Sequence, residues 1–176
     1  MIIHNQQTMT FTLHTRSTTY QMKADGYQTL LHTYYGPRIR DCDMSCLIPY
    51  ADMGFSPNPH AAGNRRDYSL DFLPQEYSTC GVGDFRLPSL ELELPCFAGW
   101  EIRKGKYTLP GLPAFYGTAE EADTLVLTLE DAAAGVAVEL YYGVFEEFDL
   151  ITRAVRVINR GSGNVVLCRC ASLCLD

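Results

Sequence analysis

Two groups of carboxylates are dense enough to suggest general acid and base catalysis, which requires two acidic side chains that face one substrate. These groups are Glu120, Glu121 and Asp123, and Glu146, Glu147 and Asp149. Neighbouring residues of a strand point to opposite faces, so Glu146 and Glu147 on one strand could not reach the same bond. We therefore predict solvated carboxylates at strand edges, and no residue is predicted to be catalytic.

The seven cysteines could in principle bind a metal. Cys168, Cys170 and Cys174 share parity on one predicted strand and could be joined by Cys42 and Cys46. However, a straight strand separates residues 168 and 174 by about 20 Å, too far to share one ion. Neither set has a C-x-x-C spacing. We predict no metal site and expect reduced thiols that pack as small buried apolar groups.

Other polar motifs are weak. The histidines are scattered, form no Glu-x-x-His or His-x-x-x-His pair, and are interpreted as structural or exposed: His4, His14, His32 and His60. The Arg65-Arg66-Asp67 tripeptide is interpreted as a solvated charge cluster, because exposed ion pairs are common and weak. No Gly-x-Ser-x-Gly motif occurs, and no cofactor is predicted.

Composition limits the class of protein. A chain of 176 residues with 47% hydrophobic and 20% charged residues is typical of one folded domain. The net charge of −7 disfavours nucleic acid and anionic membrane surfaces as partners. No apolar run is long enough to span a bilayer, and the N-terminus lacks the features of an export signal. We expect a cytoplasmic protein.

Apolar residues recur mainly with a period of two, which predicts half-buried strands. Residues 89–94 and 124–129 alternate strictly, and residues 135–142 and 144–151 continue the pattern as a meander. Short Thr- and Tyr-rich segments near the N-terminus predict a further antiparallel sheet: residues 2–5, 8–15, 18–22 and 29–35. Residues 151–158 and 165–174 flank a Gly-rich turn and predict a hairpin. The predicted fold class is an all-β antiparallel β-sandwich.

Residues 40–86 interrupt this pattern. They contain four prolines and four glycines and show little periodicity of either kind. Long irregular loops in a compact domain are usually disordered or functional. Because this loop retains several aromatic residues, we do not expect a wholly solvated segment.

Motifs in and after this loop carry a family resemblance. They occur in one order over most of the chain and include Phe55-Ser56-Pro57-Asn58-Pro59, Pro74-Gln75-Glu76-Tyr77, Gly83-Asp84-Phe85-Arg86, Leu109-Pro110-Gly111-Leu112-Pro113 and Ile151-Thr152-Arg153. This succession resembles the N-terminal β-sandwich domain of family 36 α-galactosidases. The resemblance implies part of a galactose mutarotase-like supersandwich, followed in similar proteins by a catalytic (β/α)8 barrel.

The resemblance also implies a role for the loop. In similar proteins the barrel carries the two catalytic aspartates of a retaining mechanism, and no residue of this chain corresponds to them. The sandwich domain contributes an acidic and an aromatic residue to the sugar pocket of a neighbouring subunit. The matching positions are Asp52 and Phe55. A carboxylate accepts hydrogen bonds from sugar hydroxyls, and an aromatic ring covers the apolar face of galactose.

Residues 1–176 are therefore expected to form the non-catalytic N-terminal sandwich domain of an α-galactosidase, incomplete at its C-terminal end. Its expected partners are an α-galactoside, the barrel and further copies in a homo-oligomer. An alternative is a stand-alone carbohydrate-binding or interaction module. A third hypothesis, a sugar epimerase, is ranked last, because that chemistry requires a histidine and a carboxylate that converge on the concave sheet, and no histidine lies beyond His60.

Overall fold

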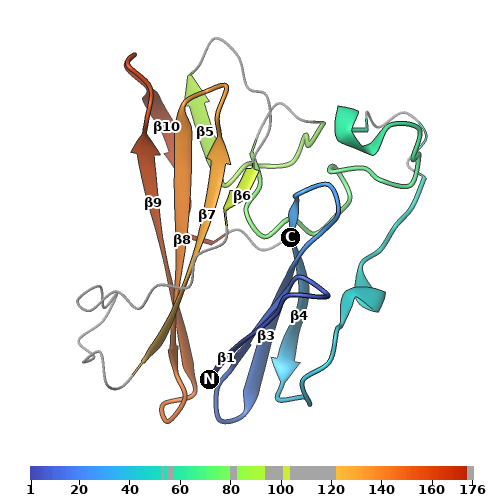
Figure 1. Ribbon diagram of the computed structural model, residues 1–176, viewed down its shortest axis with the longest axis vertical. Helices are drawn as coiled ribbons and strands as arrows, with labels where there is room; N and C mark the ends of the chain where they lie inside the picture. Colours follow the sequence, from blue (N-terminus) through green and yellow to red (C-terminus); the bar gives the residue numbers. More distant parts are fainter. Residues whose placement is uncertain (53, 55–57, 80–82, 94–100, 104–121, 174–176) are drawn as a thin grey trace.

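In the part of the chain that the structure describes, the fold contains two antiparallel sheets of four strands and a two-stranded ribbon (Figure 1). The computed structural model describes residues 1–52, 54, 58–79, 83–93, 101–103 and 122–173. All strand pairs in this part of the chain are antiparallel, and its only helical elements are two short 3-10 turns. The prediction of an all-β antiparallel β-sandwich is confirmed.

The first sheet contains the N-terminal strands in sequence order: β1 (Ile2–Asn5), β2 (Thr10–His14), β3 (Thr18–Ala24) and β4 (Leu30–Pro37). Alternate residues of β2 and β3 point into the sandwich, where Phe11, Leu13 and Met22 are almost completely buried. Their partners across the strands are in register, with Phe11 opposite Met22. The predicted N-terminal sheet is therefore confirmed.

The second sheet has the order β6 (Glu101–Arg103), β7 (Asp123–Asp131), β8 (Val136–Phe145) and β9 (Leu150–Asn159). The predicted break between residues 142 and 144 is wrong, because β8 continues through Gly143. A Cβ atom at Gly143 would lie 2.6 Å from Thr152 Oγ1 of β9, so the glycine permits close strand approach rather than a turn. The true reversal is the turn at residues 146–149.

The core lies between these two sheets. Leu125, Leu127 and Leu129 of β7 point inward, as their alternation predicts, and Leu127 is fully buried. Leu90 and Leu92 of the ribbon strand β5 (Leu90–Glu93) join the same cluster. Burial of these side chains stabilises the sandwich by about 1.5–3 kcal/mol each.

The predicted hairpin of residues 151–158 with 165–174 is wrong. Strand β10 (Val166–Cys170) pairs with β5, not with β9. The connection after β9 is attached to the β7–β8 turn, because Arg160 N and Gly161 N donate to the carbonyl oxygen of Gly135 at 2.7 and 3.0 Å. Gly135 has a φ of +65°, and a Cβ there would meet the backbone of Gly161 at 3.0 Å. These contacts direct the chain away from β9.

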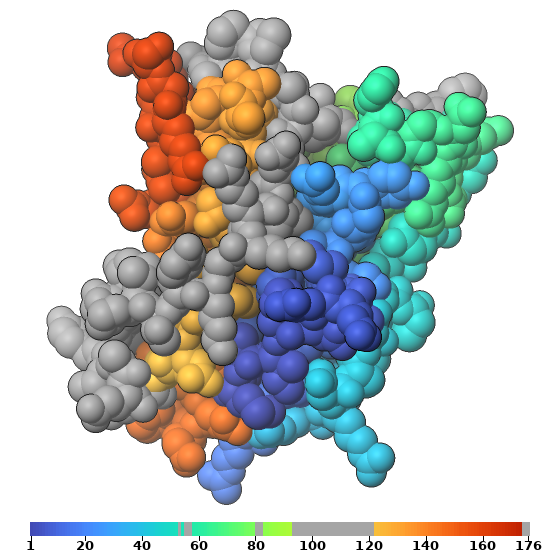
Figure 2. Space-filling view, viewed as in Figure 1, coloured from blue at the N-terminus to red at the C-terminus, as the bar shows by residue number. Residues whose placement is uncertain are grey.

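Much of the segment between β4 and β5 packs on the outer face of the first sheet, whereas Glu76 and Tyr77 near its end contact residues between the two sheets. Its described residues are irregular, as predicted, apart from the 3-10 turns η1 (Ser45–Leu47) and η2 (His60–Ala62). A second buried cluster holds it in place: Leu31, Ile48, Ala62, Tyr68, Leu70 and Leu73. Figure 2 shows the segment along the right side of the molecule, beside the blue strands.

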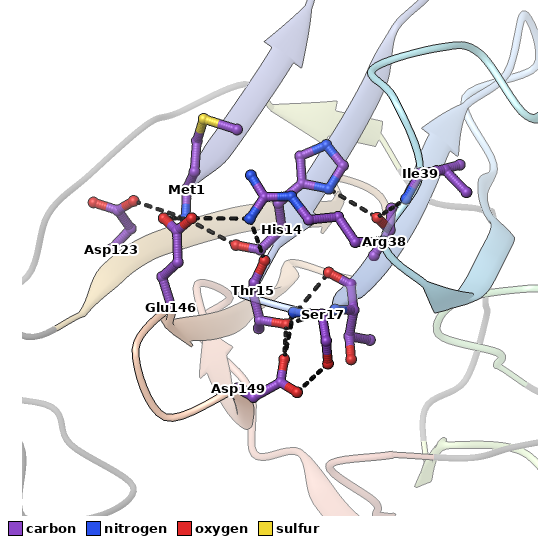
Figure 3. A network of polar contacts seen from close by, with 11 residues as sticks. Met1, His14, Thr15, Ser17, Arg38, Ile39, Asp123, Glu146 and Asp149 are labelled. Atoms are coloured by element: carbon purple, nitrogen blue, oxygen red, sulfur yellow. Dashed lines mark hydrogen bonds and ion pairs between the residues drawn. The ribbon is translucent and has the colours of Figure 1, made fainter.

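A polar network joins the two sheets at one end of the sandwich (Figure 3). Asp149, in the β8–β9 turn, accepts hydrogen bonds from the hydroxyls of Thr15 and Ser17 in the β2–β3 turn. Glu146 pairs with the Met1 ammonium group and with Arg38, both at 3.1 Å. Glu146 and Glu147 lie in a turn and not on a strand, so the predicted reason for separating them is wrong. Glu146 and Asp149 connect the sheets.

Candidate functional site

Asp52 lies on the segment that covers the first sheet. Its Oδ1 accepts a hydrogen bond from Gly54 N at 2.9 Å, and its Oδ2 lies 3.1 Å from Arg66 Nε. Gly54 has a φ of +70°, a conformation that a glycine adopts without strain. The Asp52 side chain is 47% exposed. The carboxylate is thus held in one place while part of it faces solvent, where it can accept a hydrogen bond from a ligand hydroxyl.

Phe55, the second predicted site residue, lies outside the described residues. The structure instead brings Asp52 together with the Arg65-Arg66-Asp67 tripeptide. The expectation of a solvated charge cluster is confirmed, because the side chains of Arg65, Arg66 and Asp67 are 37%, 72% and 44% exposed, but these side chains also make specific contacts. The Arg65 guanidinium lies 4.4 Å from the centre of the Tyr50 ring and pairs with Asp67 through Nε at 2.9 Å.

Three tyrosine rings pack beneath the Arg65 side chain of the Arg65-Arg66-Asp67 tripeptide. Tyr68 is fully buried, and its hydroxyl donates to Asp25 and lies 2.9 Å from Thr29 Oγ1. Burial and the Asp25 carboxylate raise the pKa of Tyr68, so the hydroxyl remains protonated at neutral pH. The rings of Tyr27 and Tyr50 lie 4.5 and 6.4 Å from the Tyr68 ring. These packed rings restrict the motion of Arg65, whose guanidinium lies against them.

A second polar cluster lies between the two sheets and is centred on Glu76, whose side chain is 1% exposed. Glu76 accepts hydrogen bonds from Tyr142 at 2.7 Å and from Tyr20 at 2.7 and 2.8 Å, and it lies 2.7 Å from Arg153 Nη1. Arg153 Nη2 also donates to the Glu76 carbonyl oxygen at 2.8 Å. We call this set, Glu76, Arg153, Tyr20 and Tyr142, the Glu76 cluster. It joins β3, β8 and β9 to the covering segment.

The electrostatics of the Glu76 cluster favour one charged pair. Burial and the Glu76 carboxylate raise the pKa of both tyrosines, which therefore stay neutral. Burial alone would lower the pKa of Arg153, but Tyr142 and Glu76 raise it, so the guanidinium is charged. The guanidinium also lies 5.3 Å from the centre of the Tyr142 ring.

The Glu76 cluster borders a pocket of about 430 Å³ between β4 and β9. His32 reaches it from β4, with Nδ1 3.5 Å from Glu76 Oε2. A histidine and a carboxylate therefore do converge, although the histidine comes from β4 and not from the part of the chain beyond His60. However, both oxygens of Glu76 already accept hydrogen bonds from tyrosines, and Oε1 also faces Arg153. The carboxylate is not available to abstract a proton from a sugar.

The cysteines differ from the prediction. Cys42, Cys46, Cys168 and Cys170 are free, as expected, but they are exposed and not buried. All five residues of β10 are exposed, so parity along this strand does not decide burial. Cys80, Cys96 and Cys174 lie outside the described residues. Within the described part of the chain, no group of three His, Cys, Asp or Glu side chains is placed to bind a metal, and no helix could cross a membrane.

Comparison with known proteins defines the class of this domain. The model of the glycosyl hydrolase family 36 N-terminal domain matches residues 28–176. The chain belongs to this family. It is 48% identical over 183 residues to the bifunctional α-galactosidase/sucrose kinase AgaSK of Mediterraneibacter gnavus, covering 99% of this chain and 20% of that protein. The galactosidase domain of AgaSK has a TM-score of 0.86 to this structure, covering 99% of this chain and 25% of that one.

Two further solved structures of α-galactosidases share the fold of this chain. The crystal structure of α-galactosidase AgaB from Geobacillus stearothermophilus is 37% identical, with a TM-score of 0.81 over 98% of this chain and 24% of its own. A variant of AgaA from the same organism, crystallised with raffinose, is 35% identical, with a TM-score of 0.77 over 93% of this chain and 24% of its own. This chain thus spans about a fifth to a quarter of the length of the relatives it matches.

Proposed function

We propose that the chain is the non-catalytic N-terminal part of an α-galactosidase and supplies one wall of the galactose pocket. The observation that carries the proposal is the family match over residues 28–176, combined with an Asp52 carboxylate that is anchored and partly exposed. The parent reaction would be hydrolysis of terminal α-galactosides with retention, at two aspartates of a (β/α)8 barrel.

In this proposal Asp52 accepts hydrogen bonds from galactose hydroxyls, and Phe55 covers the apolar face of the sugar. The raffinose complex of the AgaA variant supports an α-galactoside as the ligand class. The Glu76 cluster supports a structural role for the rest of the chain, because Glu76 and Arg153 pair with each other and with the tyrosines of the cluster. The chain then contributes binding and assembly, and the barrel contributes bond cleavage.

Assembly into a homo-oligomer is part of the same proposal. All residues of β10 are exposed, and Val166 and Leu167 are 52% and 50% exposed. Apolar side chains at an exposed strand favour pairing with another surface. We also place the protein in the cytoplasm, where the four exposed free thiols would stay reduced.

A chimera tests this function. Residues 1–176 replace the matching segment of AgaSK, to which they are 48% identical, and hydrolysis of raffinose is measured. We expect an active chimera whose KM rises about tenfold or more on Asp52→Asn, because a hydrogen bond to a charged group contributes about 1.5–3 kcal/mol. An active chimera in which Asp52→Asn leaves KM unchanged would contradict the role in the pocket.

The stand-alone binding module remains the second candidate, since Asp52 is already ordered within this chain. Calorimetry with galactose and melibiose separates the two. If the chain is a stand-alone module, the 176-residue chain alone releases heat when it binds the sugar, and this heat is lost in the variants Asp52→Ala and Phe55→Ala. A pocket wall that needs the barrel gives no heat.

A further inference from the structure

Asp52 and Gly54 form a turn that is closed by the hydrogen bond from Gly54 N to Asp52 Oδ1, here called the Asp52 turn. Described residues before and after this turn contact one dipeptide, Arg65-Arg66. Before the turn, the Tyr50 ring lies under the Arg65 guanidinium at 4.4 Å, and Asp52 pairs with Arg66 at 3.1 Å. After the turn, Asn58 Nδ2 donates to the carbonyl oxygen of Arg65 at 2.5 Å. Three separate contacts therefore converge on two adjacent residues.

Arg65 is itself held firmly. Its Nε and Nη2 atoms bind the two oxygens of Asp67 at 2.9 and 3.2 Å, a bidentate geometry that fixes the guanidinium plane. The guanidinium also lies 5.7 Å from the centre of the buried Tyr68 ring. The backbone that carries Arg66 is anchored in turn, because Tyr68 N donates to the Arg65 carbonyl oxygen at 3.3 Å.

Arg66 differs from Arg65, because among the described residues its side chain pairs with Asp52 alone. Its side chain is 72% exposed, and the ion pair with Asp52 is a surface pair. Such pairs add little to folding stability, because solvent screens them and both side chains lose rotamer freedom. The contact does restrict the direction of the Asp52 carboxylate, whose other oxygen is held by Gly54 N.

We propose that Arg66 is a positioning residue for sugar binding, which orients the Asp52 carboxylate toward the galactose hydroxyls. This inference rests on the proposed function of Asp52. Arg65 fixes the backbone that carries Arg66, and Arg66 sets the rotamer of Asp52 before the sugar binds. Without Arg66, the Asp52 carboxylate is not oriented in advance and must lose rotamer freedom when the sugar binds. Affinity for the sugar therefore falls, while the bond-breaking step in the barrel is unaffected.

The test uses the AgaSK chimera with raffinose and compares Arg66→Met, Arg66→Lys, Asp52→Asn and the double variant Asp52→Asn/Arg66→Met. We expect Arg66→Met to raise KM about 1.5- to 5-fold at constant kcat, the range that a surface ion pair allows. Arg66→Lys retains the charge and should restore most of the affinity. The double variant should match Asp52→Asn alone, because Arg66 acts through Asp52.

Arg156→Met is the matched control. Arg156 is 64% exposed, pairs with Glu139 at 3.5 Å on the second sheet and should leave KM unchanged. If Asp52→Asn raises KM but Arg66→Met does not, the positioning role is overturned and the pocket role stands. If the two single effects add in the double variant, Arg66 acts independently of Asp52 and the inference is also overturned. If neither variant changes KM, the proposed function itself fails.

Discussion

Glu76→Gln tests whether the Glu76 cluster holds the sandwich together. The substitution preserves size but leaves the Arg153 guanidinium, 9% exposed, without its carboxylate at 2.7 Å. Breaking a buried ion pair by removing one partner costs about 3–5 kcal/mol, because an uncompensated charge stays buried. This is a large part of the roughly 5–15 kcal/mol that stabilises a typical domain. At about 2–4 °C per kcal/mol for this chain length, Tm should fall by about 6–20 °C.

The assay is urea unfolding of the 176-residue chain followed by circular dichroism, with thermal melts alongside. The double variant Glu76→Gln/Arg153→Met removes both charges and should recover at least half of the loss. Glu91→Gln is the control, because Glu91 and Arg169 form an exposed pair at 3.9 Å, and its cost should stay below about 1 kcal/mol. A loss below about 1 kcal/mol for Glu76→Gln, or no recovery in the double variant, would refute the reasoning.

Three further outcomes are expected. The hydroxyls of Ser17 and Thr15 lower the pKa of Asp149 to about 2, so its contribution to stability is complete above the unfolded pKa near 4 and is lost as pH falls toward 2. A carboxyl NMR titration of Asp149 with a midpoint near 4 would contradict this. Leu127→Ala should cost about 2–5 kcal/mol in urea unfolding, because Leu127 is fully buried, whereas Val166→Ala should cost far less. The chain should elute with a mass above 19.7 kDa in light-scattering chromatography, since β10 exposes apolar side chains; a clean monomer would count against assembly.

Part of the candidate site was predictable and part was not. The type of Asp52 and its place in an irregular, Pro- and Gly-rich loop can be read from the sequence. Its pairing with Arg66 could not, because the two residues belong to different turns of that loop. The only available signal was the adjacent charges of Arg65-Arg66-Asp67, which is equally typical of a solvated surface.

The Glu76 cluster was missed for a similar reason. Tyr20, Glu76, Tyr142 and Arg153 come from four distant parts of the chain, and each is unremarkable in its own segment. The packing of the two sheets, together with the attachment of the covering segment to β4, places them within hydrogen-bonding distance. The same packing brings His32 to Glu76, which no spacing rule for metal or catalytic pairs would indicate.

The sequence by itself determined most of the strand-forming regions and several inward faces, since alternation at residues 124–129 forces Leu125, Leu127 and Leu129 to one side of any sheet. It did not determine which strands pair. Residues 159–164 look like a hairpin turn, yet β10 joins β5, because the contacts of Arg160 and Gly161 with Gly135 redirect the chain. Local patterns specify which face of a strand is buried, whereas partner choice and polar clusters depend on contacts between residues far apart in the chain, which only the tertiary structure decides.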